Sequence, residues 1–550
     1  MNPPQQGVDT AADLRGQEPP DTTAAADSVR IAAWTLVSRL TGVLRVAAIG
    51  AVLGPTLLGN TFQFTNSLPN LVYYGFLAGS LFSSLLVPTL VATLDTGDRR
   101  AAERIAGGFL GTAFAALAAA AVVAVLVGPV LLRIGALGTQ DAAAEAGQAH
   151  MARVLILLLA PQVRLYAVVG TSTAVMNARR RFALAAAAPA LENVGIIVVL
   201  GMTALLFEAS DPLGTVPPAE LMLLGVGATA AVALHAAVQW WGARRAGVTL
   251  RPRAGWRDPE VRALVRRSFP ALALAGITEV QPLVLLMLAN RVAGGVVAMQ
   301  IGLTFYYLVV ALAVTPVALS LLPRLSQAHL REDRDGFRNG LAEGLALVVF
   351  VTVPAAVGYL LVARPLAEVI AVGQMSSHAG ALLIATTIAA LAPGLIGDGL
   401  FKVMTYGCYA RRDTRTPLRA MAVQAATFLP LASCAFLVPP AAVPLTLGAA
   451  FSVANTLGAW RLARWLRGSA PGVGARLARC AGRVATGAVV MAAVVMPIAL
   501  LVPRWLEGRT GWTVAASASV IVGVAAFALV QAWWRAPEIS WLLGSVGRRS

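Results

Sequence analysis

Long apolar runs, broken by short polar segments rich in arginine, cover almost the whole chain. Most of these runs exceed the roughly 20 residues that an α-helix needs to cross a bilayer core about 30 Å thick. They are far too long for the strands of a membrane β-barrel, so the pattern predicts an all-α polytopic membrane protein. The runs predict fourteen spans, at residues 31–54, 61–94, 105–134, 149–177, 182–208, 219–243, 266–291, 295–323, 338–364, 377–409, 417–438, 441–464, 480–503 and 510–534.

The composition agrees with this pattern. Hydrophobic residues make up 58% of the 550 and charged residues 13%, whereas a soluble domain has about 25% charged residues. The three cysteines, Cys408, Cys434 and Cys480, have no paired spacing, so we expect neither a disulfide nor a metal site. Residues 1–29 are polar and lack the apolar core of a signal peptide, which predicts a disordered cytoplasmic tail. Residues 536–550 are expected to form a second cytoplasmic tail.

The basic residues are distributed unevenly between the two sides of the predicted membrane. The formal net charge is +17, and Lys402 is the only lysine, which indicates a bacterial source with a GC-rich genome. With the N-terminus inside, the inner loops and the C-terminal tail hold 31 arginines and the outer segments hold five. This asymmetry follows the positive-inside rule and predicts that both termini are cytoplasmic. Because topology explains the charge, we expect no nucleic-acid partner.

Two short motifs recur at nearly the same separation along the chain. LAP at 159–161 followed by ARR at 178–180 reappears, with identical internal spacing, at 391–393 and 410–412. LLVPTL at 85–90 is echoed by SLLPRL at 320–325. Both separations correspond to six predicted helices, and an even number keeps the two halves in the same orientation across the membrane. The motifs therefore predict a parallel repeat, with a substrate site between the halves.

The repeat divides the chain into two lobes and an appended pair of helices. Such duplicated bundles are typical of transporters that work by alternating access. An enzyme is not expected, because the outer loops are short and their acidic residues show no paired catalytic arrangement; no cofactor is expected either. The predicted units are the N-lobe with helices 1–6 at 30–247, the C-lobe with helices 7–12 at 248–467, and helices 13 and 14 at 468–535.

Four cations lie within predicted spans: Arg39, Arg45, Arg164 and Lys402. Arg39 and Arg45 lie roughly 12 Å and 21 Å into the first helix, too far apart to reach the same interface. Arg164 and Lys402 lie on repeat-related helices, each after a proline that predicts a kink beside a cavity. A cavity rich in arginine suits an anionic solute, phosphate above all. By this reasoning the four are candidates for substrate binding. A fifth cation, Arg153, is near a helix end and is expected to snorkel.

The intramembrane carboxylates leave a second interpretation open. Each cation could pair with Glu192, Glu279 or Asp398 simply to hold helices together. Glu279 and Asp398 are also candidate sites for a coupling ion or proton, with helix-pairing ion pairs again as the alternative.

Several stretches resemble the MurJ (MviN) lipid II flippases of the MOP exporter superfamily. The opening SRLTGVLR and the following LGPTLLGNTFQFTNSLPNLVYYGFLAGSLFSSLLVPTL are similar to the start of that family. KVMTYGCYARRDTRTP at 402–417 is similar to its K-x-L-x-x-x-FY-x-R-x-D-x-K-TP pattern, and MNARRRFALAAAAPALENV at 176–194 to its LN-x4-F-x3-A-x-AP-x-x-x-N pattern. Residues 293–326 align without a gap to its eighth helix.

The resemblance implies a function. The family carries a polyprenyl-diphosphate-linked peptidoglycan precursor from the inner to the outer leaflet of the cytoplasmic membrane. It implies two lobes, a lipid-tail groove beside helices 13 and 14, and coupling to membrane potential or a cation gradient. Implied partners are the lipid-linked anionic glycan, membrane lipids, and proteins of cell-wall synthesis or division. Loss of family arginines leaves two alternatives: export of another glycolipid or amphipathic solute, and a non-transporting scaffold for envelope synthesis.

The resemblance also implies particular site residues. Arg39 and Arg45 match two arginines that face the diphosphate in the family. Tyr73 and Thr304 stand where the family has further arginines, and Asn60 stands in place of an aspartate. Val46 and Ala78 replace two further acidic residues. The expected substrate-binding set is Arg39, Arg45, Asn60, Asn70, Tyr73, Arg164, Thr304 and Lys402.

Overall fold

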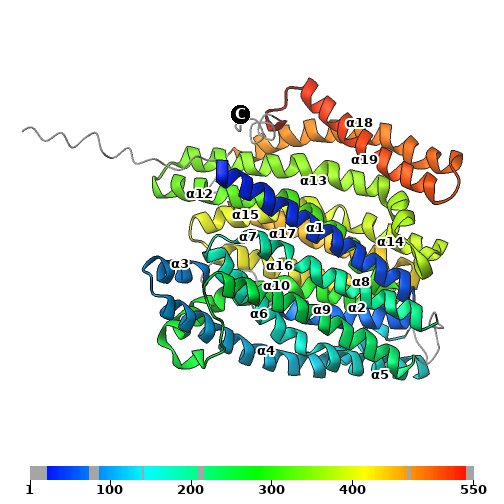
Figure 1. The fold of residues 1–550 in the computed structure, drawn as a ribbon. Helices are drawn as coiled ribbons and strands as arrows, with labels where there is room; N and C mark the ends of the chain where they lie inside the picture. The colour runs from blue at the N-terminus through cyan, green and yellow to red at the C-terminus, as the bar shows by residue number, and fades with distance from the viewer. Residues whose placement is uncertain (1–21, 74–85, 139–141, 209–215, 467–471, 540–550) are drawn as a thin grey trace, which may run out of the picture.

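The computed structural model is a bundle of long helices, described here for all residues except 1–21, 74–85, 139–141, 209–215, 467–471 and 540–550 (Figure 1). No strand occurs among the described residues. In chain order the α-helices are α1 (Thr22–Leu53), α2 (Leu57–Tyr73), α3 (Val87–Asp95), α4 (Arg99–Ala136), α5 (Ala142–Leu159), α6 (Pro161–Ala178), α7 (Phe182–Ala187), α8 (Pro189–Leu206), α9 (Pro218–Arg245), α10 (Pro259–Ala289), α11 (Gly295–Val309), α12 (Thr315–Leu330), α13 (Arg334–Ile370), α14 (His378–Leu391), α15 (Gly394–Ala410), α16 (Arg415–Ser433), α17 (Val443–Leu466), α18 (Val473–Trp505) and α19 (Gly508–Trp533). Short turns of other helix types are η3 (Gly255–Arg257), the π-turn η4 (Val310–Val314), η5 (Gly373–Ser376), η6 (Cys434–Phe436) and η7 (Pro440–Ala442).

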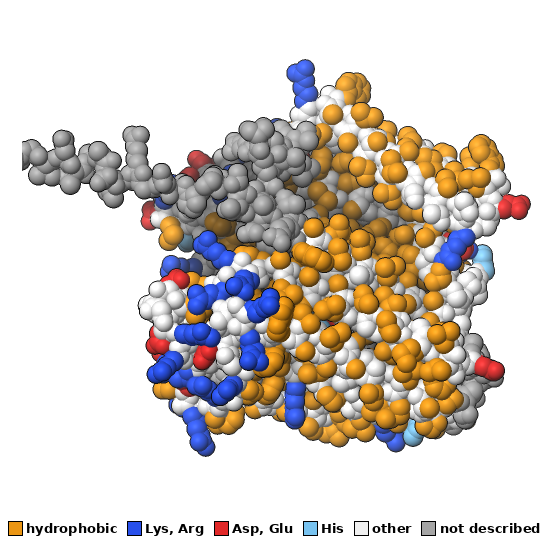
Figure 2. Space-filling model, viewed as in Figure 1, with side chains coloured by type: hydrophobic (Ala, Val, Ile, Leu, Met, Phe, Trp, Pro, Cys, Tyr) orange, Lys and Arg blue, Asp and Glu red, His pale blue; other side chains and the backbone are white. Residues whose placement is uncertain are grey.

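The membrane-spanning character predicted from the sequence is confirmed. Twelve segments of the described chain are long and apolar enough to cross a membrane, and they coincide with twelve of the fourteen predicted spans. The second predicted span corresponds to α2 and α3, which flank residues outside the described part. The seventh corresponds to α10, whose most apolar part, Ala275–Ala289, is shorter than a full span. Figure 2 shows apolar side chains covering most of the visible face.

The two chain ends differ from the sequence prediction. Helix α1 begins at Thr22, so residues 22–29 are helical and the predicted tail extends no further than residue 21. Three consecutive alanines in this stretch favour a helix despite its polar neighbours. After α19, Ala536 and Glu538 are both buried, so the described start of the second predicted tail packs against the bundle.

The structure contains the predicted parallel repeat. Arg180 and Arg412, the last residues of the two ARR copies, both follow a helix end with positive φ, at 54° and 58°. Non-glycine residues rarely adopt this conformation, so the coincidence is specific. Asp98 follows LLVPTL at 85–90, and Asp333 follows SLLPRL at 320–325 at the same distance along the chain. Both cap a helix by accepting a hydrogen bond from the backbone N–H three positions on, at 2.8 Å and 2.7 Å.

Prolines interrupt one span in each repeat, as predicted. Helix α5 ends at Leu159 and α6 begins at Pro161, while α14 ends at Leu391 and α15 begins just after Pro393. Proline lacks the N–H that would continue the helical hydrogen-bond ladder, and its ring clashes with the preceding turn.

The helices pack into two lobes and an outlying pair. We call α1–α9 the N-lobe and α10–α17 the C-lobe. In the N-lobe, α1 packs on α8, and α6 and α8 pack on α9; in the C-lobe, α15 and α16 pack on α17. The lobes meet where α1 and α2 contact α11 and where α4 contacts α10. Helices α18 and α19 lie along α13 at the edge of the bundle (Figure 1).

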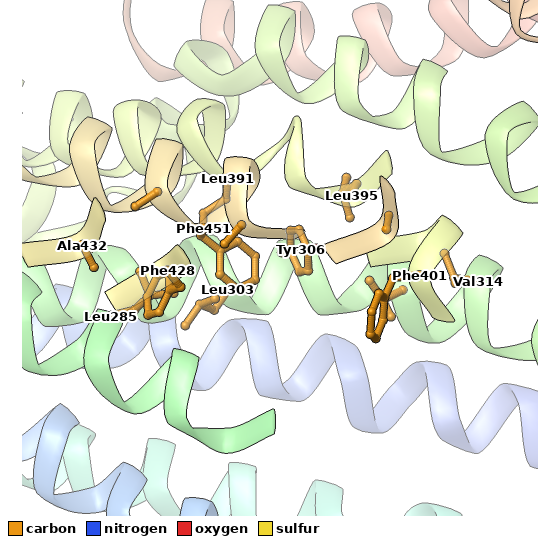
Figure 3. Close-up of a cluster of buried hydrophobic side chains, with 14 of the residues drawn as sticks. Leu285, Leu303, Tyr306, Val314, Leu391, Leu395, Phe401, Phe428, Ala432 and Phe451 are labelled. Carbon is orange, nitrogen blue, oxygen red and sulfur yellow. The ribbon is translucent and has the colours of Figure 1, made fainter. Parts of the chain in front are cut away.

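The largest buried apolar cluster is centred on the C-lobe (Figure 3). Within it, Phe451 makes edge-on contacts with Tyr306 and Phe428, with ring centroids 5.2 Å and 6.4 Å apart. Leu285 and Leu303 from α10 and α11 complete this part of the cluster. Because lipid is as apolar as these side chains, tight dispersion contacts of this kind hold the helices together.

Candidate functional site

Arg45 of α1 lies beside a buried carboxylate. Its Nη1 is 3.5 Å from Oε1 of Glu192 on α8, and the two side chains are 16% and 8% exposed. The sequence interpretation in which an intramembrane arginine pairs with Glu192 is therefore correct for Arg45. The Nε of Arg45 is buried without an acceptor among the described residues. The guanidinium thus keeps one hydrogen-bond donor unused in this conformation.

Glu192 gathers two more partners from other helices. Tyr166 of α6 donates its hydroxyl to Glu192 Oε1 at 2.9 Å, and His235 Nδ1 of α9 lies 2.9 Å from Oε2. The ring of Tyr73 from α2 stacks on Tyr166 at 5.3 Å. We call Arg45, Glu192, His235 and Tyr166 the Glu192 network. Burying a carboxylate costs free energy unless the group is paired and hydrogen-bonded, and Glu192 has both an ion pair and hydrogen bonds.

Arg39, one of the two motif arginines, takes a different position from Arg45. It is exposed on α1, before Arg45 and closer to the start of the helix. Asn193, next to Glu192 on α8, fixes this part of α1: its Nδ2 lies 3.2 Å from the Ser38 carbonyl and 3.1 Å from Thr41 Oγ1. Adjacent residues of α8 therefore hold α1 in register and neutralise its deeper arginine.

Asn60 lies where the two lobes meet, at the end of the bundle where α1 finishes. Its Nδ2 donates to the Val292 carbonyl at 2.8 Å, and its Oδ1 accepts from the Val296 N–H at 3.0 Å. An aspartate could not donate to Val292, which explains why an amide stands at this position. Nearby, Gln148 and Asn290 exchange hydrogen bonds at 2.9 Å and 3.1 Å. The side chain of Asn60 is engaged in joining α2 to the start of α11.

The remaining predicted binding residues are scattered. Asn70 is half-buried on α2, and Arg164 is exposed on α6. Thr304 donates to the Gln300 carbonyl of its own helix at 2.7 Å. Of the predicted set, the structure brings Arg45 and Tyr73 into one constellation, through Tyr166. It does not place Arg164, Thr304 or Lys402 in contact with them.

A second group of polar side chains lies in the C-lobe. Lys402 of α15 donates to Thr315 Oγ1 at 3.3 Å. Asp398 lies one turn before Lys402 and interacts electrostatically with it. Glu279 of α10 and Asp398 also interact electrostatically with Tyr307 of α11. Within the described residues, neither carboxylate has an ion-pair partner closer than 4.0 Å. We call these five residues the C-lobe cluster; it unites the predicted Glu279, Asp398 and Lys402.

Sequence reasoning missed several members of these two groups. His235 was detectable from the sequence, because it is an ionisable side chain inside a predicted span. In the structure its side chain is buried. Tyr166, Tyr307 and Thr315 carry no such signal, since tyrosine and threonine are common in membrane helices. Among the described residues no group of three or more His, Cys, Asp or Glu is arranged to hold a metal ion.

Comparisons with known proteins identify relatives over most of the chain. The family model described as "Lipid II flippase MurJ" matches residues 49–530. Probable lipid II flippase MurJ of Vibrio cholerae is 26% identical over 402 residues, which is 71% of this chain and 73% of that protein. Lipid II flippase MurJ of Burkholderia cenocepacia is 26% identical over 397 residues, 71% of this chain and 74% of that one.

Solved structures are similar over a still larger part. A lipid II flippase MurJ in an inward closed conformation superposes with a TM-score of 0.70, covering 92% of this chain and 99% of that one at 14% identity. An inward-facing multidrug resistance MATE family transporter of the MOP superfamily gives a TM-score of 0.58 at 11% identity, covering 80% and 98%. At these identities the two matches show the fold alone.

Proposed function

Because the chain belongs to the MurJ family of lipid II flippases, a family of multi-pass proteins of the bacterial inner membrane, we propose that it moves lipid II from the inner to the outer leaflet. The two parallel lobes open alternately to the two sides, and the chain acts as a transporter rather than an enzyme. The observation that carries the proposal is Arg45, an intramembrane guanidinium with an unused buried donor. Such a group suits the diphosphate of a lipid-linked precursor.

The two arginines of α1 act in sequence on the diphosphate. Arg39, which is exposed in the middle of α1 and precedes Arg45, meets the headgroup first. The diphosphate then reaches Arg45 and takes the place of Glu192 on its guanidinium, while His235 and Tyr166 retain the carboxylate. Glu192 thus keeps Arg45 ready between cycles and competes for it at release, so binding stays reversible. The other predicted binding residues, Asn60, Asn70, Tyr73, Arg164, Thr304 and Lys402, contribute less to substrate binding, because apart from Tyr73, which stacks on Tyr166, the structure does not gather them around Arg45.

The C-lobe cluster couples transport to its driving force. Glu279 and Asp398 come from different helices and have no ion-pair partner closer than 4.0 Å among the described residues. Carboxylates placed in this way take up a proton or a cation when one is supplied. The driving ion or the membrane potential therefore acts through the C-lobe, and the substrate through the N-lobe.

The orientation follows from the charged end of the bundle. Figure 2 shows Lys and Arg gathered at one end of the visible face. Exposed arginines at that end include Arg99 and Arg100 at the start of α4 and Arg251 and Arg253 before α10. We place this end, with both termini, in the cytoplasm. On the basis of family membership, we assign residues 30–247 to the N-lobe, 248–467 to the C-lobe and 468–535 to the lipid-tail groove. Family membership also suggests proteins of cell-wall synthesis or division as partners.

Export of a different anionic glycolipid is the second candidate function. Tyr73 and Thr304, at positions where the family has arginines, favour it, because each replaces a cation with an uncharged side chain. A substrate with one phosphate rather than two would need fewer cations.

Complementation tests the proposal. The protein is expressed in cells depleted of their own lipid II flippase, and survival and outer-leaflet lipid II are measured. We expect rescue by the wild type, loss of rescue by Arg45→Ala, and rescue by the matched control Arg153→Ala, which removes an exposed arginine on α5. Absence of rescue at good expression would exclude lipid II as the substrate, and rescue by Arg45→Ala would remove the site assignment.

A further inference from the structure

A cavity of about 530 Å³ lies between α13, α18 and the segment after α19, apart from the Glu192 network. Its volume falls within the range of roughly 300–1,000 Å³ found for small-molecule sites. Three arginines of α18 line it: Arg476, Arg479 and Arg483. Their spacing of three and four residues puts them on one face of the helix. Figure 1 shows α18 and α19 lying against α13.

The cavity has more positive charge than its own acidic residues balance. Arg483 is paired with Glu538, at 3.0 Å. Glu343, the other acid in the lining, is 3.4 Å from Arg324 on α12. Arg476 contacts the amide oxygen of Asn339 at 2.8 Å and, among the described residues, has no carboxylate partner.

Arg479 is the least engaged of the three arginines. It is exposed, and the part of the chain that the structure describes supplies it with no hydrogen bond or ion pair. Arg476 and Arg479 therefore present two uncompensated guanidinium groups to one cavity.

The position of the cavity along α18 indicates the kind of ligand. The arginines occupy the first three turns after Val473, and Arg476 contacts Asn339 near the start of α13, beside the basic loop between α12 and α13. Further along α18, Val489, Val490 and Val494 are 68%, 41% and 40% exposed. A ligand with its phosphate at the arginines can lay acyl chains along this apolar surface. Guanidinium groups bind phosphate through paired hydrogen bonds, and basic pockets between membrane helices on the cytoplasmic side bind anionic headgroups.

We propose that this cavity binds the headgroup of an anionic phospholipid of the inner leaflet. The phosphate lies between Arg476 and Arg479, and Arg483 remains bound to Glu538. The lipid fastens the beginning of α18 to α13, the helix against which the appended pair packs. A zwitterionic headgroup binds less well, because its cation is repelled by the same two arginines.

Native mass spectrometry of the full-length protein tests this proposal. Phosphatidylglycerol, phosphatidylethanolamine, inorganic phosphate and lipid II are added separately, and bound species are counted. We expect preferential retention of phosphatidylglycerol. Arg476→Gln/Arg479→Gln is expected to weaken it roughly 25-fold, since each basic residue near the membrane surface contributes a factor of about five. The matched control is Arg461→Gln/Arg464→Gln on α17, which removes two arginines outside the cavity and should leave binding unchanged.

Each other outcome overturns the proposal. Equal retention of phosphatidylethanolamine would show that charge does not select the ligand. Equal losses in the two double variants would reduce the effect to general surface electrostatics. If inorganic phosphate binds as tightly as phosphatidylglycerol, the cavity is a site for free phosphate. If lipid II displaces phosphatidylglycerol from the wild type, and Arg476→Gln/Arg479→Gln abolishes this displacement, the cavity is a site for lipid II. An unchanged thermal midpoint without lipid shows that the variant is folded.

Discussion

Each lobe links three corresponding helices through buried polar side chains, but the N-lobe uses charged side chains and the C-lobe uses neutral amides. In the N-lobe, Arg45 and Glu192 link α1 to α8, and His235 adds α9. In the C-lobe, Gln424 of α16 donates to Gln281 of α10 at 3.4 Å and contacts the amide of Asn455 on α17. Arg45 corresponds to Gln281 and Glu192 to Gln424, because each pair is separated along the chain by nearly the same distance as the two copies of the repeated motifs.

This difference separates scaffolding from function. The amides of the C-lobe show that hydrogen bonds alone can join these helices at this position. The ion pair of the N-lobe is therefore more than the scaffold requires, and it carries the cost of burying charge. We attribute the surplus charge to the substrate, so the helix-pairing interpretation of Arg45 is correct but incomplete. The C-lobe places its own charges in the C-lobe cluster, where neither carboxylate has an ion-pair partner closer than 4.0 Å among the described residues.

The largest expected effect on stability comes from removing the N-lobe carboxylate. Glu192→Ala leaves Arg45 and His235 buried without their partner, and breaking a buried pair in this way costs about 3–5 kcal/mol. The C-lobe counterpart Gln424→Ala removes only neutral hydrogen bonds and should cost about 1–3 kcal/mol. Thermal unfolding of the purified variants measures both. Equal losses of unfolding free energy in the two variants would mean that the N-lobe ion pair stabilises the fold no more than the C-lobe amides do.

A smaller effect is expected where the lobes meet. Asn60→Asp leaves the Val292 carbonyl facing a carboxylate, which we expect to cost about 1–3 kcal/mol. Asn70→Asp, on the same helix but half-buried, is the matched control. Unfolding midpoints compare the two variants. If Asn60→Asp is as stable as the wild type, the Asn60 contacts do not hold the lobes together.

Glu279→Gln should change coupling and leave stability nearly unchanged. The substitution removes a charge that has no ion-pair partner closer than 4.0 Å among the described residues, so little native energy is lost. Transport by reconstituted protein should lose its dependence on pH or on the cation gradient. Gln281→Glu adds a carboxylate close by in the sequence, within the neutral amide network, and is not expected to restore that dependence. Unaltered coupling in Glu279→Gln would exclude Glu279 from the ion path.

The smallest effect concerns the loops that end α6 and α15. Burial raises the pKa of Asp413, but hydrogen bonds from Thr416 and from the backbone N–H of Arg415 outweigh it and hold the pKa below its ordinary value. A lowered folded-state pKa stabilises the protein above the unfolded value, and this stability is lost as pH falls through the folded one. Asp413→Asn should therefore lower the unfolding midpoint slightly at neutral pH and not in acid below the folded pKa. The N-lobe has Arg181 at the related position, and Arg181→Gln should show no such pH dependence.

Much of the fold was predictable because its signals are local. Apolar run lengths predicted the spans, Pro161 and Pro393 predicted the breaks, and motifs around Arg180 and Arg412 predicted the repeat. Arg45 was predicted from the same kind of signal, since a guanidinium in an apolar run is visible in a single stretch.

The rest of the site depends on contacts between distant segments. Nothing near Asn60 in the sequence indicates that it bonds Val292, in the other half of the chain. Likewise, the neutralisation of Arg45 by Glu192 depends on how α1 packs on α8. Side-chain pairing across a bundle is set by helix rotation and depth, which residue spacing within one helix does not determine.

The most direct test transfers the C-lobe chemistry into the N-lobe. Arg45→Gln/Glu192→Gln replaces the ion pair with two amides like Gln281 and Gln424, and the variant is scored in cells depleted of their own lipid II flippase. We predict a folded protein with a near-normal unfolding midpoint that fails to rescue growth and exposes no outer-leaflet lipid II. Rescue at the wild-type level would contradict the claim that the charge of Arg45 serves the substrate.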